Sequence, residues 1–319
     1  MPKCLPCFST IINVTLKCIT KLGYLYVQIE NQEQPIGLTD NPQDGCRGGV
    51  LMTKKTFIQK HAVLFYFVLV FLISWVGSYL VVGTRYLQGG VPELRDIGLM
   101  AIPMLGAPFG VGILMSYLAD GQKGLQDLFS RMRKWKVGIR WYLPLLIFPV
   151  LLLSVLWVLT IVASPKMVPT FIVPFIFIGL VGGSLEEMGW MGFAFPKMSL
   201  GRSILGTALI LGIIHGVWHF CADFLANYGS MGGYHWLLYS AGFFIHVVAL
   251  RILIAWVYTN TDSLFLAMMM HGSSTGFYGV FTYNLVDPEL RAIFYIVYGL
   301  VLWLAAIAVI LKYGKNLRK

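Results

Sequence analysis

The sequence is poor in charged residues. Only 12% of its 319 residues are charged and 14 are acidic, whereas 57% are hydrophobic and the mean hydropathy is +0.74. A soluble domain of ordinary composition carries about twice that share of charged residues. The composition therefore argues against a soluble globular domain and indicates that much of the apolar surface faces lipid.

Cysteine is scarce, and no internal repeat is visible. Four of the five cysteines lie in residues 1–51, where Cys4-x-x-Cys7 has no second closely spaced pair, so a zinc-binding motif is not indicated. Cys221 follows His219 by two positions, on roughly the opposite helix face, which argues against a cysteine nucleophile. The lack of a repeat disfavours a transporter with a proton relay, because transporters often carry one.

Long apolar runs dominate the rest of the chain. A helix needs about 20 apolar residues to cross a bilayer core of about 30 Å. Eight stretches approach that length: 62–84, 97–118, 141–164, 169–194, 203–223, 235–258, 263–283 and 291–312. A β-barrel would instead show alternating segments of about ten residues. We predict an all-α fold, a polytopic membrane helical bundle of about eight transmembrane helices.

Basic residues gather on alternate loops between these stretches. Segment 123–140 and the tail 312–319 are rich in lysine and arginine, whereas 224–234 contains neither. This pattern predicts that both termini are cytoplasmic in an integral, multi-pass protein of the cell (plasma) membrane. The net charge of +10 then indicates contact with membrane lipids rather than nucleic acid. A dedicated partner site on 123–140 is the less favoured alternative.

The N-terminal 51 residues differ from the remainder. They contain no full-length span, and Lys17 and Lys21 interrupt their apolar stretch, so they fit a signal peptide poorly. Met52 opens a short basic leader before the first span, and we expect it to be the natural start. We therefore expect an N-terminal extension of no assigned function over 1–51. A transmembrane domain follows over 52–319, with its motif core at about 180–280.

Ionisable side chains occur at membrane depth on four successive predicted helices, in order Glu186 and Glu187; His215 and His219; His246 and Arg251; and His271. Such groups cost a few kcal/mol to insert and usually face a functional cavity. Packing alone does not readily explain four helices in succession. For His246 by itself, a hydrogen bond to a neighbouring helix is the favoured interpretation, and Arg251 is expected to pair with a carboxylate.

The spacing of these groups indicates which of them share a helix face. Adjacent helical residues point about 100° apart, so Glu186 and Glu187 cannot perform one task together. His215 and His219 are four apart and share a face, as do His271 and Thr275.

Together these groups have the chemistry of a hydrolase. A carboxylate and an imidazole can polarise a water molecule. A second imidazole and a hydroxyl can donate hydrogen bonds to an oxyanion. The pattern therefore predicts a hydrolase that attacks with an activated water.

Three motifs carry a family resemblance. EEMGWMGFAFP, HGVWHF and MMMHGSST, in that order, resemble the CPBP family of intramembrane proteases over about 95–285. That family includes type II CAAX prenyl endopeptidases and bacterial bacteriocin-processing and self-immunity relatives. The resemblance implies an endopeptidase acting on a membrane-anchored or lipidated substrate, either a peptide or a lipidated protein.

The resemblance also implies residue roles. Glu186 and His219 would activate the water, and Glu187 would support them. His271 would stabilise the oxyanion with help from Thr275, one turn further along. His215 and Arg251 would be supporting residues.

Three positions depart from the family pattern. Met191 stands where arginine is expected, Thr275 where asparagine is expected, and His215 where phenylalanine is usual. The arginine would neutralise Glu187 at i,i+4. Without it, either Glu187 is neutral or another cation replaces the arginine, with Arg251 the first candidate and His215 a weaker one. The departures leave open an alternative: a catalytically impaired relative acting as a membrane scaffold or a bacteriocin-immunity-type binding protein.

A metal ion is the remaining question. Glu186, His215, His219 and His271 have the donor types of a tetrahedral zinc site. However, HGVWH lacks the glutamate of the HExxH zinc-protease helix. The carboxylate–imidazole scheme implied by the resemblance needs no metal. We expect no required cofactor, with zinc as the alternative.

Overall fold

The computed structural model describes residues 16–20, 23–27, 56–83 and 93–318. The chain divides into two compact units, Met1–Lys54 and Lys55–Lys319. The sequence-based boundary at 51/52 lies three residues before this division. Met52, the expected natural start, is outside the described residues, so that expectation stays a prediction.

The first unit contains a β-hairpin that the sequence analysis did not anticipate. Strands β1 (Leu16–Thr20) and β2 (Gly23–Val27) pair antiparallel, with Leu16 opposite Val27 and Thr20 opposite Gly23. Both strands contain β-branched or aromatic residues, which favour extended backbone. No function is assigned to this unit.

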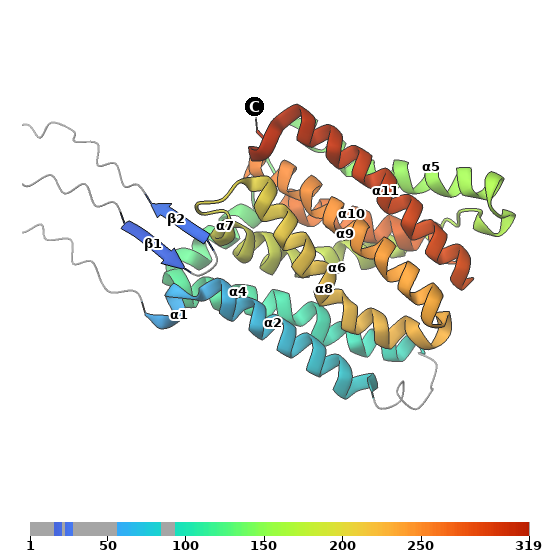
Figure 1. Ribbon diagram of the computed structural model, residues 1–319, viewed down its shortest axis with the longest axis horizontal. Helices are drawn as coiled ribbons and strands as arrows, with labels where there is room; N and C mark the ends of the chain where they lie inside the picture. The colour runs from blue at the N-terminus through green and yellow to red at the C-terminus, as the bar shows by residue number, and fades with distance from the viewer. Residues whose placement is uncertain (1–15, 21–22, 28–55, 84–92, 319) are drawn as a thin grey trace, which may run out of the picture. The chain divides into compact units, whose positions relative to one another are not determined.

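The second unit is helical, which confirms the predicted fold class of a polytopic helical membrane protein (Figure 1). Its α-helices are α1 (Phe57–Lys60), α2 (Ala62–Ser78), α4 (Leu94–Met132), α5 (Ile147–Val162), α6 (Phe175–Gly189), α7 (Phe195–Met198), α8 (Ile204–Met231), α9 (Gly233–Thr261), α10 (Leu264–Thr282) and α11 (Pro288–Tyr313). Two π-helical turns, η1 (Tyr79–Gly83) and η5 (Trp190–Ala194), extend α2 and α6. Short 3₁₀ turns are η2 (Ile139–Trp141), η3 (Leu143–Leu146), η4 (Pro165–Met167) and η6 (Gly314–Asn316).

Six of the helical segments in the described residues are long and apolar enough to cross a membrane. They are Ala62–Gly83, Arg95–Met132, Ile139–Val162, Ile204–Met231, Gly233–Thr261 and Pro288–Asn316. The predicted spans 169–194 and 263–283 are not among them. α6 has 15 residues before its π turn, and α10 has 19 and contains the polar run HGSST. The expected count of eight is therefore not confirmed, and the cytoplasmic placement of the termini stays a prediction.

The helix at the predicted second span is longer than expected. α4 continues through residues 123–132, which the sequence analysis treated as part of a loop between spans. Its backbone leaves helical geometry at Gly121, where φ is 64° and ψ is −151°, a conformation open mainly to glycine. The described helix is thus two segments joined at this glycine.

α6 and α10 approach each other so closely that their backbones touch. A Cβ atom added to Gly183 would lie 2.5 Å from the Gly272 nitrogen, and one added to Gly272 would lie 2.8 Å from the Leu180 Cα. Gly179 and Gly276 meet in the same way. Both helices therefore use the small-xxx-small spacing that permits close helix packing in membranes. This contact holds the end of α6 beside the middle of α10.

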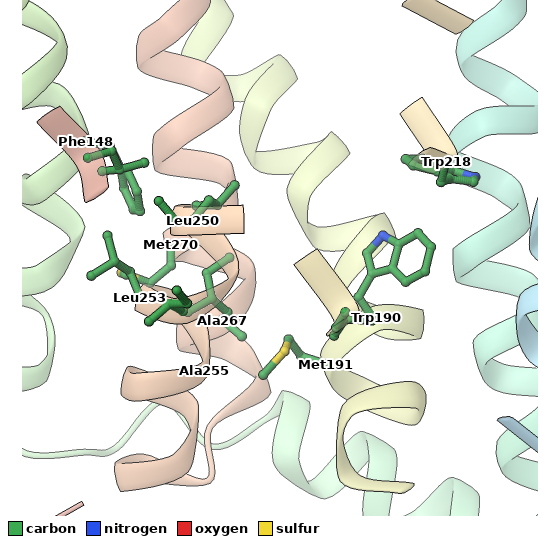
Figure 2. Packing of buried hydrophobic residues seen from close by; sticks show 14 of the residues in the cluster. Phe148, Trp190, Met191, Trp218, Leu250, Leu253, Ala255, Ala267 and Met270 are labelled. Carbon is green, nitrogen blue, oxygen red and sulfur yellow. The ribbon is translucent and has the colours of Figure 1, made fainter. Parts of the chain in front are cut away.

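Helices α8, α9 and α11 complete the surroundings of that pair, with α9 between the other two (Figure 1). Side-chain caps define where these elements begin: Ser203 accepts from the Gly206 nitrogen at the start of α8. Ser263 likewise accepts from the Leu266 nitrogen at the start of α10. Figure 2 shows the apolar core that surrounds the site helices, with Phe148, Leu253 and Met270 gathered on one side.

Candidate active site

Both glutamates lie in the last turn of α6, directly before the π turn η5. Glu187 is fully buried and Glu186 is 6% exposed. π-helical turns are rare and are frequent at functional sites. The local sequence thus places two carboxylates inside the helical unit, where each needs a partner.

Glu187 is held by a cation from α9. The Arg251 Nη1 donates to Glu187 Oε2 at 2.8 Å, and Nη2 lies 2.6 Å from Oε1. Both side chains are completely buried. His271 Nδ1 lies 2.7 Å from the same Oε1, so α10 also contributes to the arrangement. The predicted pairing of Arg251 with a carboxylate is therefore present, and Arg251 supplies the cation that position 191 lacks.

Glu186 has different partners. Its Oε2 lies 2.9 Å from His215 Nε2 on α8 and accepts a hydrogen bond from Trp190 Nε1 at 3.3 Å. His271 Nε2 is 4.0 Å from the same oxygen. The resemblance implied that Glu186 and His219 act together on the water, and that role stays a prediction. The imidazole in direct contact with Glu186 is His215, one helical turn earlier on the same face of α8.

Arg251 also determines which ring nitrogen of His215 carries the proton. Its Nε donates to His215 Nδ1 at 3.2 Å, and a guanidinium can only donate. His215 Nδ1 must therefore be an acceptor, which leaves the ring proton of the neutral imidazole on Nε2. That N–H donates to Glu186. Arg251 thus orients both carboxylates, Glu187 directly and Glu186 through His215.

His219 lies at the edge of this cluster. Its ring is 4.8 Å from that of His215, centroid to centroid, and it is only part-buried. A nitrogen of His219, a nitrogen of His215 and a carboxylate oxygen of Glu186 all lie within 4.8 Å of one another. His219 makes no hydrogen bond to any residue that the structure describes. Its ring nitrogens therefore remain available to a small molecule next to Glu186.

The helices that carry this site lie in the part of the chain that is similar to known proteins. Residues 168–277, which span α6 to α10, match the profile of the type II CAAX prenyl endopeptidase Rce1-like family. CAAX prenyl protease 2 of Methanococcus maripaludis is 28% identical to this chain over 220 residues, 64% of this chain and 78% of that protein. Over these residues the chain is similar to the type II CAAX prenyl endopeptidases. The two matches and the long apolar helices indicate a protease of the CAAX prenyl endopeptidase type in an integral, multi-pass membrane protein.

Met191 of the protease is buried among apolar groups. Figure 2 shows its side chain directed toward Ala255 and Ala267, whereas Trp190 points away from them. Met191 is fully buried and belongs to the hydrophobic core. Because η5 is wound as a π turn, the simple i,i+4 relation between Glu187 and position 191 also does not apply here.

Thr275 does not join the bonded cluster of the protease. It is exposed and makes no hydrogen bond to a described residue, whereas His271 is 4% exposed. Four residues turn a helix by about 400°, so Thr275 projects within about 40° of His271. Its exposure therefore reflects its level along α10, one turn beyond the cluster. The expected hydroxyl contribution to the site is not seen in these contacts.

The donors also bear on metal binding by the protease. Of the four candidates, the structure groups Glu186, His215 and His219, a donor set that zinc accepts. His271 is not part of this group, although its Nε2 lies 4.0 Å from Glu186 Oε2. However, Arg251 donates a hydrogen bond to His215 Nδ1, so the ring proton of His215 lies on Nε2. Nε2 is the nitrogen that faces Glu186 and would have to bind the metal, and a protonated nitrogen has no lone pair to offer. The hydrogen bonding thus fits zinc poorly.

Two contacts of the protease were only partly foreseen. Trp190 is completely buried and donates to Glu186, four residues before it. That i,i+4 spacing was a signal in the sequence, although an indole is more often packing than function. His246 Nε2 lies 3.3 Å from Ser274 Oγ on α10, which agrees with the structural role expected for it.

Proposed function

We propose that the chain is an intramembrane endopeptidase that hydrolyses a peptide bond of a membrane-anchored or lipidated substrate with a water activated by Glu186. The observation that carries the proposal is the state of the Glu186 carboxylate. Its Oε2 is held by His215 and Trp190, and its other oxygen has no hydrogen bond to a described residue. One oxygen is thus fixed in place while the other can accept a proton.

His219 completes the position of the water. A water molecule that makes two hydrogen bonds of about 2.8 Å bridges atoms roughly 4.5 Å apart. The separation of up to 4.8 Å between Glu186 and His219 suits such a bridge. Glu186 then acts as general base, and His219 orients the water.

The position of His271 supports it as the oxyanion donor. Its Nδ1 lies 2.7 Å from Glu187 Oε1, the oxygen that Arg251 also contacts. Its Nε2 lies 4.0 Å from Glu186 Oε2, on the side of the proposed base. An N–H at this nitrogen can stabilise an oxyanion.

Hydrolysis proceeds through addition of water and collapse of a tetrahedral intermediate. As the water oxygen attacks the carbonyl carbon, its proton moves to Glu186 and the carbonyl π electrons move to oxygen, next to His271. Collapse of this intermediate re-forms the C=O bond and breaks the C–N bond. Glu186 then gives its proton to the leaving nitrogen, which restores the carboxylate.

The substrate class rests on the relatives and on the site's depth. The Methanococcus maripaludis relative is a CAAX prenyl protease by name, and lipid-modified chain ends are held at the membrane. The site in this chain lies within a membrane protein and between its helices. A lipidated or membrane-anchored segment is the substrate that can be delivered there.

The test is cleavage of lipidated and unmodified membrane peptides by the detergent-purified chain, comparing wild type with Glu186→Gln. We expect Glu186→Gln to lose at least about a thousandfold in turnover, because the amide cannot accept the water's proton. Glu289→Gln, a change of the same chemistry at an exposed position on α11, should leave turnover unchanged.

Turnover that survives Glu186→Gln would rule out Glu186 as the base. If the folded wild type cleaves none of the peptides, the result favours the alternative function of a scaffold or immunity-type binding protein.

A further inference from the structure

A second concave site lies away from the carboxylates, where one end of α9, one end of α11 and the turns before α5 meet. It is a cavity of about 690 Å³. Its wall is formed by Arg140, Trp141, Leu143, Pro144, Ile147, Trp256, Asn260, Lys312, Tyr313 and Arg318. The catalytic cluster contributes none of these residues, so the proposed protease chemistry does not explain the cavity.

The charge of this cavity is of one sign. Arg140, Lys312 and Arg318 line it, and its wall contains no acidic residue. Among the described residues none of the three makes an ion pair. The Arg318 guanidinium donates to the backbone oxygen of Thr259, which positions the group but does not neutralise it. Within the part of the chain that the structure describes, the cavity therefore carries three positive charges with no acidic partner.

Aromatic rings hold the cations in place. The Trp141 ring lies 5.4 Å from that of Trp256, and Trp256 lies 5.6 Å from Tyr313. Arg140 stands over Trp141 at 5.6 Å, and Lys312 over Tyr313 at 5.4 Å. Cations over aromatic rings are stabilised without being neutralised. The wall thus presents positive charge on a framework of tryptophan and tyrosine.

The position of the cavity indicates the source of its ligand. It lies at the ends of two apolar helices that are each long enough to cross a membrane, and tryptophan and tyrosine are enriched at that level. Basic pockets between transmembrane helices bind anionic lipid head groups. Leu143, Pro144 and Ile147 add an apolar side to the same wall, against which an acyl chain can lie.

We propose that this cavity binds the phosphate of an anionic phospholipid head group. Arg140, Lys312 and Arg318 contact the phosphate, and the tryptophan and tyrosine rings pack against the glycerol backbone. A zwitterionic lipid offers the same phosphate but brings its own cation into a cavity that already has three. Selectivity for anionic lipid follows from this excess of positive charge.

The proposal is tested by native mass spectrometry of the full-length chain with phosphatidylglycerol and phosphatidylcholine of identical acyl chains. The cavity variant is Arg140→Gln with Lys312→Gln. The matched control is Lys123→Gln with Lys136→Gln, which removes the same charge from exposed positions outside the cavity. A third arm adds inorganic phosphate as competitor. Thermal unfolding confirms that each variant is folded.

We expect the wild type to retain one phosphatidylglycerol with at least about tenfold preference over phosphatidylcholine. The cavity variant should lose roughly tenfold or more in this affinity, and the control should change by less than about twofold. Equal loss in both variants, or equal binding of the two lipids, would overturn the proposal. Displacement by millimolar phosphate would do so as well, because it would show that a free anion suffices. An unfolded cavity variant would be replaced by Arg140→Gln alone, with Lys123→Gln as its control.

Discussion

Arg251 and Lys134 each pair with one carboxylate, but they do so in opposite surroundings. Arg251 and Glu187 are 2.6 Å apart and completely buried. Lys134 and Asp262 are 3.3 Å apart, with 45% and 60% of their side chains exposed. Water can replace either partner of the second pair, whereas nothing replaces a partner of the first. A buried charge in this protein therefore requires a partner of opposite sign in contact with it. An exposed charge does not, because water can solvate it.

The largest expected effect comes from breaking the inner pair. Arg251→Met leaves Glu187 buried without its cation, and we expect the free energy of unfolding to fall by roughly 3–5 kcal/mol, with turnover lost. Lys134→Met should cost at most about 1 kcal/mol. Thermal unfolding in detergent measures both. Similar losses for the two variants would contradict the distinction between the pairs.

Removing both inner partners should be milder than removing one. Arg251→Met combined with Glu187→Gln leaves no unpaired charge, so we expect it to recover about 2 kcal/mol relative to Arg251→Met alone. Turnover should not recover, because His215 and His271 lose the groups that orient them. A double-mutant cycle on unfolding free energies measures the coupling free energy between Arg251 and Glu187. A purely additive cycle would mean that the two side chains do not interact.

A smaller effect is expected at His215, where another side chain can make the same two hydrogen bonds. His215→Gln retains an acceptor for Arg251 and a donor for Glu186, and we expect turnover within about tenfold of wild type. His215→Leu retains neither and should lose at least about a hundredfold. Steady-state cleavage at saturating substrate distinguishes them. If both variants are equally inactive, the role of His215 requires the imidazole itself.

The smallest expected effect is that of chelation. Because Arg251 keeps a proton on the His215 nitrogen nearest Glu186, we propose that catalysis requires no metal. Turnover by protein purified without chelator should stay within about twofold after treatment with EDTA or phenanthroline. Loss of activity that zinc restores would show instead that Glu186, His215 and His219 hold an ion.

The sequence predicted the site residues whose placement follows from one rule, namely that it costs free energy to bury an ionisable group in a membrane. Charged groups are rare at membrane depth, so Glu186, Glu187, Arg251 and His271 could be singled out without coordinates. The need of a buried carboxylate for a cation also pointed to Arg251. These inferences depend on the chemistry of the groups and on no detail of packing.

Other features depend on how the helices sit against one another. His215 and His219 share one face of α8, and only the height of α8 relative to α6 decides which of them meets Glu186. The same holds for Thr275, which spacing places on the face of His271 but whose distance from the bonded cluster spacing does not reveal. Its contribution to the site stays a prediction. The continuation of α4 past Gly121 and the π turn after Gly189 depend on local backbone geometry, which spacing does not reveal.

The contact between α6 and α10 limits how a substrate can approach. Where Gly183 meets Gly272, the two peptide backbones touch, so no side chain at that seam can swing aside to admit a polypeptide. The helices that carry Glu187 and His271 are thus in backbone contact at this seam, and the two side chains also contact each other. We expect a substrate strand to reach Glu186 from the side of α8, where His219 is only part-buried.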